Sequence, residues 1–323
     1  MAGFVPAILL ILTEIKMRIK RKNSWKPFMV LFIFPAAAIY TFFLLLPIVD
    51  SLRLSFYSGS GFIPTEFVGL KNYVKLFTEF PFKKRILNAF TNNIEFFVIV
   101  TIVQNIFGFF VAFLVTRKIM GNNFFRKISF LPTTLSVLVV GFLFKLILNP
   151  AWGIFDKMLT AVGLSGIIRP WLGDPVTALP ALAIVVSWQF MGESVLFYTA
   201  GIDAIPDDTL EAARIDGANP LQELWYIIIP AIMPIIGIVT ILIFIGDFTQ
   251  FDIVYAMATT QANPGFATDL FGSLFYRATF STPVRGGWGM GMGAAVSSLM
   301  FILVFSAVML WLYFFKMKGD SNE

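Results

Sequence analysis

The chain of 323 residues contains no cysteine and no histidine. The absence of cysteine excludes disulfides and thiol nucleophiles, and the absence of both residue types excludes Cys/His zinc sites and histidine bases. Charged residues are also scarce: they make up 13% of the chain, whereas about 25% is usual in a soluble domain. These deficits argue against a soluble enzyme.

Apolar sequence is what the chain has in abundance. Apolar residues make up 58% of it, 38 residues are phenylalanine, and the mean hydropathy is +0.82. A transmembrane helix needs about 20 mostly apolar residues to cross a hydrocarbon core about 30 Å thick. Six stretches meet this requirement, and none alternates with the period of two that marks a barrel strand. The predicted spans are 28–50, 92–115, 128–148, 178–200, 231–254 and 294–315.

Lysine and arginine in the connecting segments indicate the orientation, because cytoplasmic loops carry an excess of them. With the N-terminus inside, the inner segments hold 13 basic residues in 77 positions and the outer segments 10 in 109. The cluster of Lys83, Lys84 and Arg85 runs against this assignment, since it falls outside. We expect both termini to be cytoplasmic, and we attribute the net charge of +5 to topology rather than to nucleic-acid binding.

The N-terminal segment Met1–Leu12 is apolar but too short to span a membrane. A signal peptide places its positive charges before the apolar run, whereas here the basic residues follow it. We expect residues 1–27 to form a cytoplasmic tail, either as an amphipathic helix on the membrane surface or as a frayed terminus. Residues 28–323 would then form the transmembrane domain.

Residues 201–230 form a polar segment between two predicted spans. Proline and acidic residues favour the first turn of a helix, glycine favours its C-terminal end, and asparagine favours an N-cap. A first helix can begin at Pro206 or Asp207 and end at Gly217, and a second can begin with Asn219 and Pro220. Such a helix–turn–helix presents alanine side chains and the Glu211 carboxylate to a partner protein. An ordinary surface loop is the alternative interpretation.

The same segment resembles a known motif. The matching residues are Glu211-Ala212-Ala213, Asp216-Gly217-Ala218, Ile227 and Pro230. They resemble the EAA motif of membrane subunits in binding-protein-dependent ABC importers, whose permeases have the type I fold. Flanking residues are similar to the carbohydrate branch, as in maltose-type importers; these are Phe67–Tyr73, Ala204-Ile205-Pro206 and Phe251-Asp252. Two departures, Leu224 and Ile229, keep an apolar side chain.

The resemblance implies a mechanism in which the loop is a coupling helix seated in a cytoplasmic ATPase subunit. The docking residues would be Glu211, Ala212, Ala213, Asp216 and Gly217. It also implies a dimer of ATPase subunits that bind ATP and Mg²⁺, a second, related permease subunit, an external solute-binding protein, and a bacterial plasma membrane. No GxxxxGK[ST] phosphate loop occurs in this chain, so we expect no cofactor in it.

Ionisable residues inside spans are candidates for function, because burying them in a membrane is costly. Glu193 lies in the middle of the fourth predicted span, and Asp247 and Asp252 flank Gln250 in the fifth. Aromatic rings beside polar groups suit sugars. The predicted substrate-pathway residues are Trp188, Glu193, Asp247, Phe248, Gln250, Phe251 and Asp252. Alternatively, these polar groups satisfy one another between helices.

We therefore expect a permease subunit that imports an oligosaccharide and is not itself an enzyme. The external residues Arg277 and Arg285 suggest an acidic saccharide as one form of the substrate. An ion-coupled secondary transporter, with Glu193 or Asp247 as the proton carrier, is the alternative. An intramembrane enzyme is disfavoured, because the remaining reactive side chains form no visible constellation.

Overall fold

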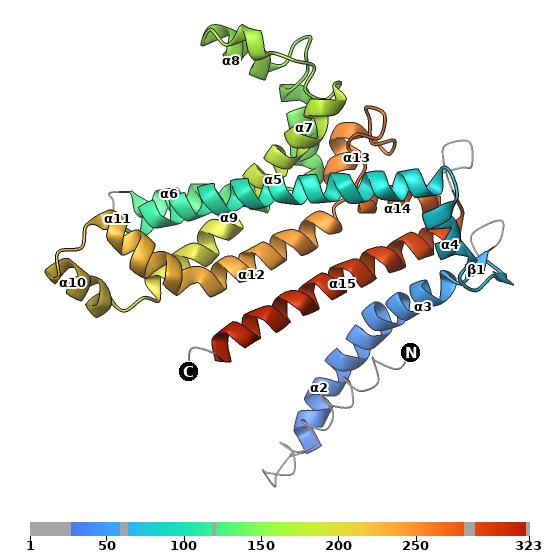
Figure 1. The fold of residues 1–323 in the computed structure, drawn as a ribbon, viewed down its shortest axis with the longest axis horizontal. Helices are drawn as coiled ribbons and strands as arrows, with labels where there is room; N and C mark the ends of the chain where they lie inside the picture. The colour runs from blue at the N-terminus through green and yellow to red at the C-terminus, as the bar shows by residue number, and fades with distance from the viewer. Residues whose placement is uncertain (1–26, 59–63, 118–120, 281–287, 321–323) are drawn as a thin grey trace. The chain divides into compact units, whose positions relative to one another are not determined.

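The computed structural model describes residues 27–58, 64–117, 121–280 and 288–320 (Figure 1). The predicted tail lies outside these residues except for Pro27. The chain divides into two compact units, residues 1–53 and 54–323.

In the first unit, the described part is one continuous helical run. It consists of α2 (Pro27–Tyr40), the π-helical turn η1 (Thr41–Leu45) and α3 (Leu46–Leu54). The stretch Phe32–Leu54 is long and apolar enough to cross a membrane, with a mean hydropathy of 2.2. It overlaps the first predicted span, 28–50.

The second unit begins with a small antiparallel sheet and a short helix. Strands β1 (Tyr57–Ser58) and β2 (Glu66–Phe67) pair with Tyr57 opposite Phe67. Helix α4 (Lys71–Thr78) follows, and its buried Asn72 donates hydrogen bonds to the carbonyl oxygens of Ser55 and Tyr57. The amide of Asn72 thus fixes the strand that leads into the helices.

Helices α5 (Phe82–Thr116) and α9 (Pro175–Asp203) pack against each other along the centre of this unit. Their approach is close at Gly108, where an added Cβ would lie 2.7 Å from the Cβ of Ser194. Their buried apolar side chains, with those of α7, α12 and α13, form the larger of two cores. The second core lies among α4, α5, α14 and α15 and includes Phe248 at the end of α12.

The third predicted span, 128–148, is broken rather than straight. The helical segments Phe124–Thr134 and Val137–Ile147 meet at 96°; they comprise α6 (Asn122–Phe130), the 3₁₀ turn η2 (Leu131–Thr134) and α7 (Val137–Ile147). Pro132 lies in this turn, and proline disfavours a continuing helix. Thr133 and Thr134 also donate their hydroxyl hydrogens to the backbone carbonyls of Phe130 and Leu131. The predicted span is therefore present as a bent pair of helical segments.

Beyond α7 lie two short helical pieces, α8 (Ile154–Ala161) and η3 (Ser165–Ile167), before α9 begins. The segment between the fourth and fifth predicted spans forms α10 (Asp207–Ile215) and α11 (Pro220–Glu223).

The fifth predicted span continues from α11 through the π-helical turn η4 (Leu224–Ile228) into α12 (Ile229–Phe248). This helix ends six residues before the predicted limit of 254, and the chain turns into the separate helix α13 (Asp252–Ala258). Helices α14 (Phe271–Phe280) and α15 (Met290–Asp320) pack together and complete the unit.

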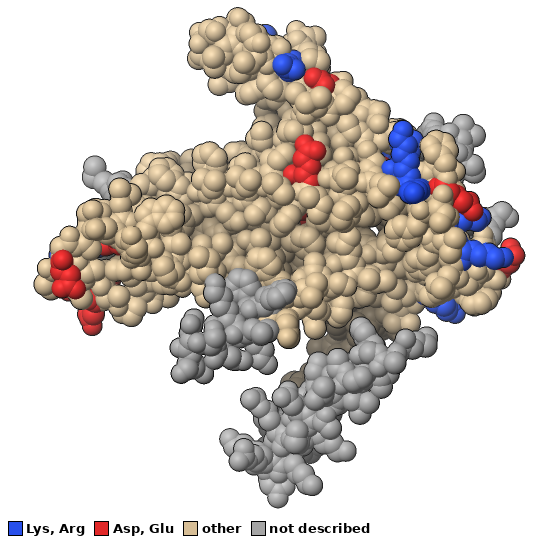
Figure 2. Space-filling view, viewed as in Figure 1, with Lys and Arg blue, Asp and Glu red and all other residues tan. Residues whose placement is uncertain are grey.

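In the described part of the chain, five helices are long and apolar enough to cross a membrane, or six if the bent pair counts as one span. The described residues thus agree with the six spans expected from the sequence. Helices α10 and α11 lie where α5 ends, opposite the end that holds α4 and α14 (Figure 1). Charged side chains gather near these two ends, with few on the surface between them (Figure 2).

Candidate functional site

The loop at residues 201–230, called the EAA loop from here on, has the predicted helix–turn–helix structure. Helix α10 begins at Asp207, and Asp207 and Asp208 occupy its first turn, where acidic side chains interact favourably with the helix dipole. Its C-terminal turn holds Arg214, a basic residue at the end that favours one. The local sequence therefore favours a short helix here.

The turn after α10 is a Schellman motif. Gly217 has φ +86°, and its N–H donates to the carbonyl of Arg214 over 3.1 Å. The N–H of Ala218 donates to the carbonyl of Ala213 over 2.9 Å. This pair of bonds and the left-handed glycine define the motif, so Gly217 makes the turn as the sequence predicts.

A capping box begins α11. The Asn219 side chain accepts hydrogen bonds from the backbone N–H groups of Leu221 and Gln222, at 3.0 and 2.9 Å. In return, the Gln222 side chain accepts from the backbone N–H of Asn219 over 2.8 Å. The end of α10 and the start of α11 are thus fixed by hydrogen bonds between near neighbours in sequence.

Four of the five predicted docking residues are exposed. Glu211, Ala212, Asp216 and Gly217 are exposed, and Ala213 is half-buried. Two large apolar side chains of the loop that the sequence analysis did not single out are also exposed: Ile215 at 85% and Leu221 at 66%. Exposed apolar side chains beside small ones are typical of a protein-binding surface.

Glu223, at the end of α11, is a further residue that the sequence analysis missed. Its side chain is 3% exposed and pairs with two arginines, Nε of Arg214 at 2.7 Å and Nη2 of Arg117 at 3.3 Å. The hydrogen bond and charge of Glu223 raise the pKa of Arg214 above its ordinary value. Because Arg117 is 106 positions from Glu223 in sequence, no local signal could have indicated this contact.

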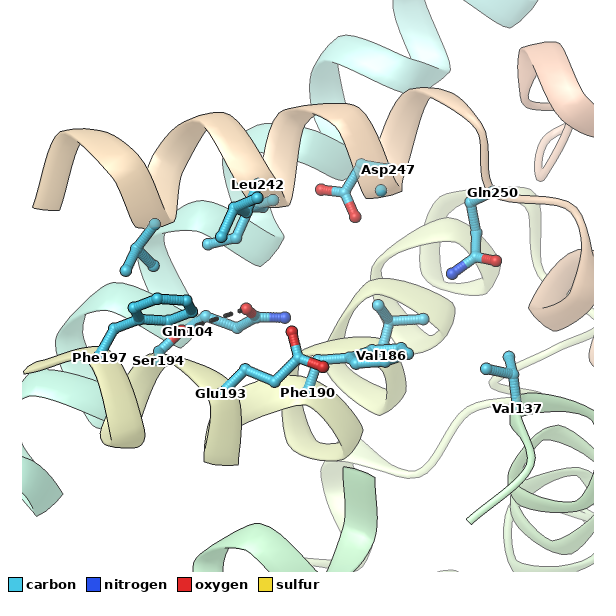
Figure 3. A pocket seen from close by; sticks show the side chains of 13 residues that line it. Gln104, Val137, Val186, Phe190, Glu193, Ser194, Phe197, Leu242, Asp247 and Gln250 are labelled. Atoms are coloured by element: carbon cyan, nitrogen blue, oxygen red, sulfur yellow. Dashed lines mark hydrogen bonds between the residues drawn. The ribbon is translucent and has the colours of Figure 1, made fainter. Parts of the chain in front are cut away.

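A cavity of about 260 Å³ lies among α5, α9 and α12 (Figure 3). Its walls are mostly apolar and include the rings of Phe190 and Phe197. Five polar side chains lie among them: Gln104, Glu193, Ser194, Asp247 and Gln250. An apolar cavity with a few converging polar groups is the usual form of a small-molecule site.

The polar groups of the cavity come from facing helices. Ser194 on α9 lies 3.4 Å from the amide oxygen of Gln104 on α5 and donates its hydroxyl hydrogen to it. The carboxyl groups of Glu193 and Asp247 point into the space between α9 and α12 (Figure 3). Asp247 is 3% exposed, and its Oδ2 has no hydrogen-bond partner among the described residues.

Three of the seven predicted pathway residues line this cavity: Glu193, Asp247 and Gln250. The other four do not. Trp188 packs against Phe144 with ring centroids 5.2 Å apart, and Phe248 is fully buried in the second core.

Phe251 and Asp252 lie beyond the end of α12 and make other contacts. The ring of Phe251 stacks on that of Tyr276 at 4.6 Å, and Asp252 begins α13. Gln104 and Ser194 line the cavity without having been predicted, although a glutamine within an apolar run was a visible signal.

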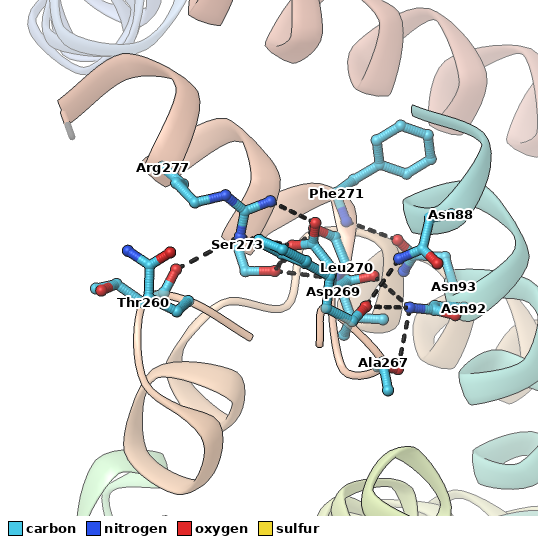
Figure 4. Close-up of polar contacts among 12 residues, drawn as sticks. Asn88, Asn92, Asn93, Thr260, Ala267, Asp269, Leu270, Phe271, Ser273 and Arg277 are labelled. Carbon is cyan, nitrogen blue, oxygen red and sulfur yellow. Dashed lines mark hydrogen bonds and ion pairs between the residues drawn. The ribbon is translucent and has the colours of Figure 1, made fainter. Parts of the chain in front are cut away.

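Arg277 does not supply the free external charge that the sequence suggested. It is 3% exposed and pairs with Asp269, which is fully buried and also accepts from Ser273 (Figure 4). Side chains of α5 hold the same segment: Asn88 and Asn92 donate to backbone carbonyls at residues 266–269, and Asn93 accepts from the N–H of Phe271. Arg285 lies outside the described residues.

Residues 104–315 match the family described as "Binding-protein-dependent transport system inner membrane component". The chain belongs to this family. It is therefore a membrane permease subunit of a transport system, not an enzyme, and the transport system depends on a solute-binding protein. Family membership also decides against the ion-coupled secondary transporter.

Several relatives cover nearly the whole permease. The probable ABC transporter permease protein YurN of Bacillus subtilis (strain 168) is 32% identical over 289 residues, which are 88% of this chain and 95% of the relative. The trehalose/maltose transport system permease protein MalF of Thermococcus litoralis is 30% identical over 90% of this chain and 94% of its own length.

Solved structures agree on the fold. A chain from a bacterial ABC transporter involved in the import of the acidic polysaccharide alginate superimposes with a TM-score of 0.70 at 19% identity. The match covers 93% of this chain and 98% of the other. This permease therefore has the type I ABC importer fold that the sequence predicted.

Proposed function

We propose that this permease forms half of the transmembrane pathway of an ABC importer for an oligosaccharide. A second, related permease chain supplies the other half, and an external solute-binding protein delivers the sugar. The family and relatives named for sugars, such as trehalose and maltose, support the substrate class. The main support for a substrate pathway in this chain is the cavity lined by Glu193, Asp247 and Gln250.

The EAA loop is proposed as the docking site for a dimer of ATPase subunits, which bind ATP and Mg²⁺. Exposure of Glu211, Ile215 and Leu221 supports this, since a carboxylate beside apolar side chains suits a partner cleft that contains a basic residue. The loop then faces the cytoplasm of a bacterium, and both chain termini lie on that side of the plasma membrane.

In the cavity, the proposed ligand is one or two sugar rings. The rings of Phe190 and Phe197 pack on the C–H faces of a sugar, and the polar side chains bind its hydroxyl groups. No lysine or arginine is among the described lining residues, whereas two carboxyl groups are. This favours a neutral saccharide over a uronate chain at this position, because the described lining offers a uronate no opposite charge with which to pair.

The docking proposal is tested in liposomes that contain the complete importer. Glu211→Ala and Gly217→Pro are compared with the unchanged complex and with Glu66→Ala, an exposed glutamate in β2. Proline cannot adopt a positive φ, so Gly217→Pro is expected to abolish ATP hydrolysis stimulated by the loaded binding protein. Co-purification shows whether the ATPase still binds. If both loop variants hydrolyse and transport as the unchanged complex does, the loop is not the docking site.

The substrate proposal is tested with the isolated binding protein and the reconstituted importer. The panel contains maltotriose, lactose and trehalose as neutral sugars and oligouronates as acidic ones. Binding and uptake of a neutral sugar support the proposal. Uptake of oligouronates alone contradicts a neutral substrate, and uptake of no saccharide contradicts the carbohydrate assignment.

A further inference from the structure

The pairing of Glu223 links the two short helices of the EAA loop to the C-terminal end of α5. Arg214 belongs to α10, Glu223 ends α11, and Arg117 follows the last residue of α5. The glutamate accepts from both arginines at once, one on each carboxylate oxygen. We refer to Arg117, Glu223 and Arg214 as the clamp.

The clamp is built around a buried charge. Glu223 is 3% exposed as a side chain, whereas Arg117 and Arg214 are 31% and 55% exposed. A carboxylate removed from water is stable only while it is paired, but an exposed arginine can be hydrated instead. Glu223 is therefore the member that depends on both partners, and it holds them in one arrangement.

The helix reached by the clamp also contacts the other functional regions. Gln104, on α5, lines the cavity. Near the start of α5, Asn92 donates to the carbonyls of Ala267 and Asp269, and Asn88 donates to that of Phe266. A rigid helix thus leads from the EAA loop past the cavity to the segment at the opposite end.

We infer that Glu223 is a positioning residue that makes the EAA loop and α5 move as one body during transport. This inference rests on the proposed docking of the ATPase at the loop. Closure of the ATPase dimer displaces the loop, and the clamp passes that displacement to α5 and so to the cavity. Rigid-body motion of packed elements is an established way to link distant sites.

A second ion pair nearby provides a matched control. Arg126 on α6 pairs with Asp203, the last residue of α9, at 3.5 Å. Both side chains are exposed, at 40% and 53%, so water can replace each partner. Replacing Arg126 tests whether the loss of an arginine in this region is enough by itself to disturb transport.

The first experiment measures the distance between the loop and α5 directly. Because this chain has no cysteine, Asp208→Cys in α10 and Leu114→Cys in α5 place two spin labels in it without any other change to its sequence, and the partner chains are used in cysteine-free form. In the complete importer, the distance between labels should be the same without nucleotide and after trapping with ATP and vanadate. Adding Arg117→Gln should make the two states differ, whereas Arg126→Gln should not.

The second experiment measures the number of sugar molecules imported per ATP hydrolysed, using the best saccharide of the panel above. Loss of coupling through the clamp should lower this ratio about tenfold in Arg117→Gln and in Glu223→Gln. Arg117→Lys keeps the charge and should restore much of the ratio. Arg117 and Glu223 act through the same contact. The double variant Arg117→Gln with Glu223→Gln should therefore lower the ratio no further than Glu223→Gln alone.

The outcomes separate the two proposals. If the unchanged complex assembles and Gly217→Pro abolishes stimulated ATP hydrolysis, the docking proposal is supported, whatever the result for the clamp variants. The clamp is then overturned if Arg117→Gln changes neither the label distance nor the ratio, or if Arg126→Gln has the same effect. If the Glu223→Gln complex does not assemble, the Arg117→Gln variant tests the clamp instead, because it leaves the pair of Arg214 and Glu223 within the loop intact.

Discussion

Glu223 and Asp247 are both almost completely buried, at 2% and 3% exposed as whole residues, but their surroundings are opposite. Glu223 has an arginine on each carboxylate oxygen, while Oδ2 of Asp247 has no partner among the described residues and faces a cavity. A buried acid with all its partners in the fold can hold the fold together. A buried acid without them is available to a ligand. Burial alone therefore does not distinguish a mechanical residue from a binding residue.

Among the buried acids that pair with arginine, Asp269 should show the largest loss of stability when its partner is removed. It is fully buried and pairs with Arg277. Arg277→Met should destabilise the protein by about 3–5 kcal/mol, because it leaves a buried carboxylate without its counter-charge. Thermal unfolding of the purified complex measures this. The double variant Arg277→Met with Asp269→Leu should recover most of the loss; if it does not, the pairing is not what Arg277 contributes.

Asp247→Asn should give the reverse pattern, with stability kept and transport lost. The substitution removes no interaction of Oδ2 within the described residues, so unfolding should change by no more than about 1 kcal/mol. Uptake should fall about tenfold if the carboxyl group binds a sugar hydroxyl, in line with a charge-assisted hydrogen bond.

Asp252→Asn is the control, since Asp252 is an exposed acid just beyond the same helix and does not line the cavity. Equal uptake by the two variants, or strong destabilisation by Asp247→Asn, would mean that Asp247 serves packing and not the ligand.

The smallest effect is expected at the exposed pair of Arg126 and Asp203. Arg126→Gln should change stability by about 0–1 kcal/mol, as is usual for ion pairs that water can replace. The thermal unfolding assay that detects the loss at Arg277 should show little difference here. A loss as large as that at Arg277 would show that exposure does not govern the cost of breaking these pairs.

The EAA loop could be predicted from the sequence because its structure depends on near neighbours. Gly217 and Asn219 form their hydrogen bonds within a few residues, so their types and spacing were sufficient. The spans could be predicted for a similar reason, since a membrane requires a continuous apolar helix of known length.

The remaining features depend on residues far apart in the chain. Gln104 meets Ser194 and Arg117 meets Glu223 only because α5, α9 and α11 pack in one order, which periodicity does not specify. The bend at 131–136 is an intermediate case: Pro132 was visible, but proline also occurs inside unbroken helices of this chain, at Pro180 and Pro234. Long-range packing decides which proline breaks a helix.

The length of α5 has a consequence for where its ends lie. Its 35 residues, at 1.5 Å each, give a rod of about 52 Å. A hydrocarbon core of about 30 Å covers little more than half of that length, and a bilayer of about 40–45 Å, headgroups included, still does not cover all of it. Upright or moderately tilted, this one helix emerges from the bilayer and places protein surface in water beyond the lipid. Soluble partners can therefore act on a transmembrane helix of this permease without entering the membrane.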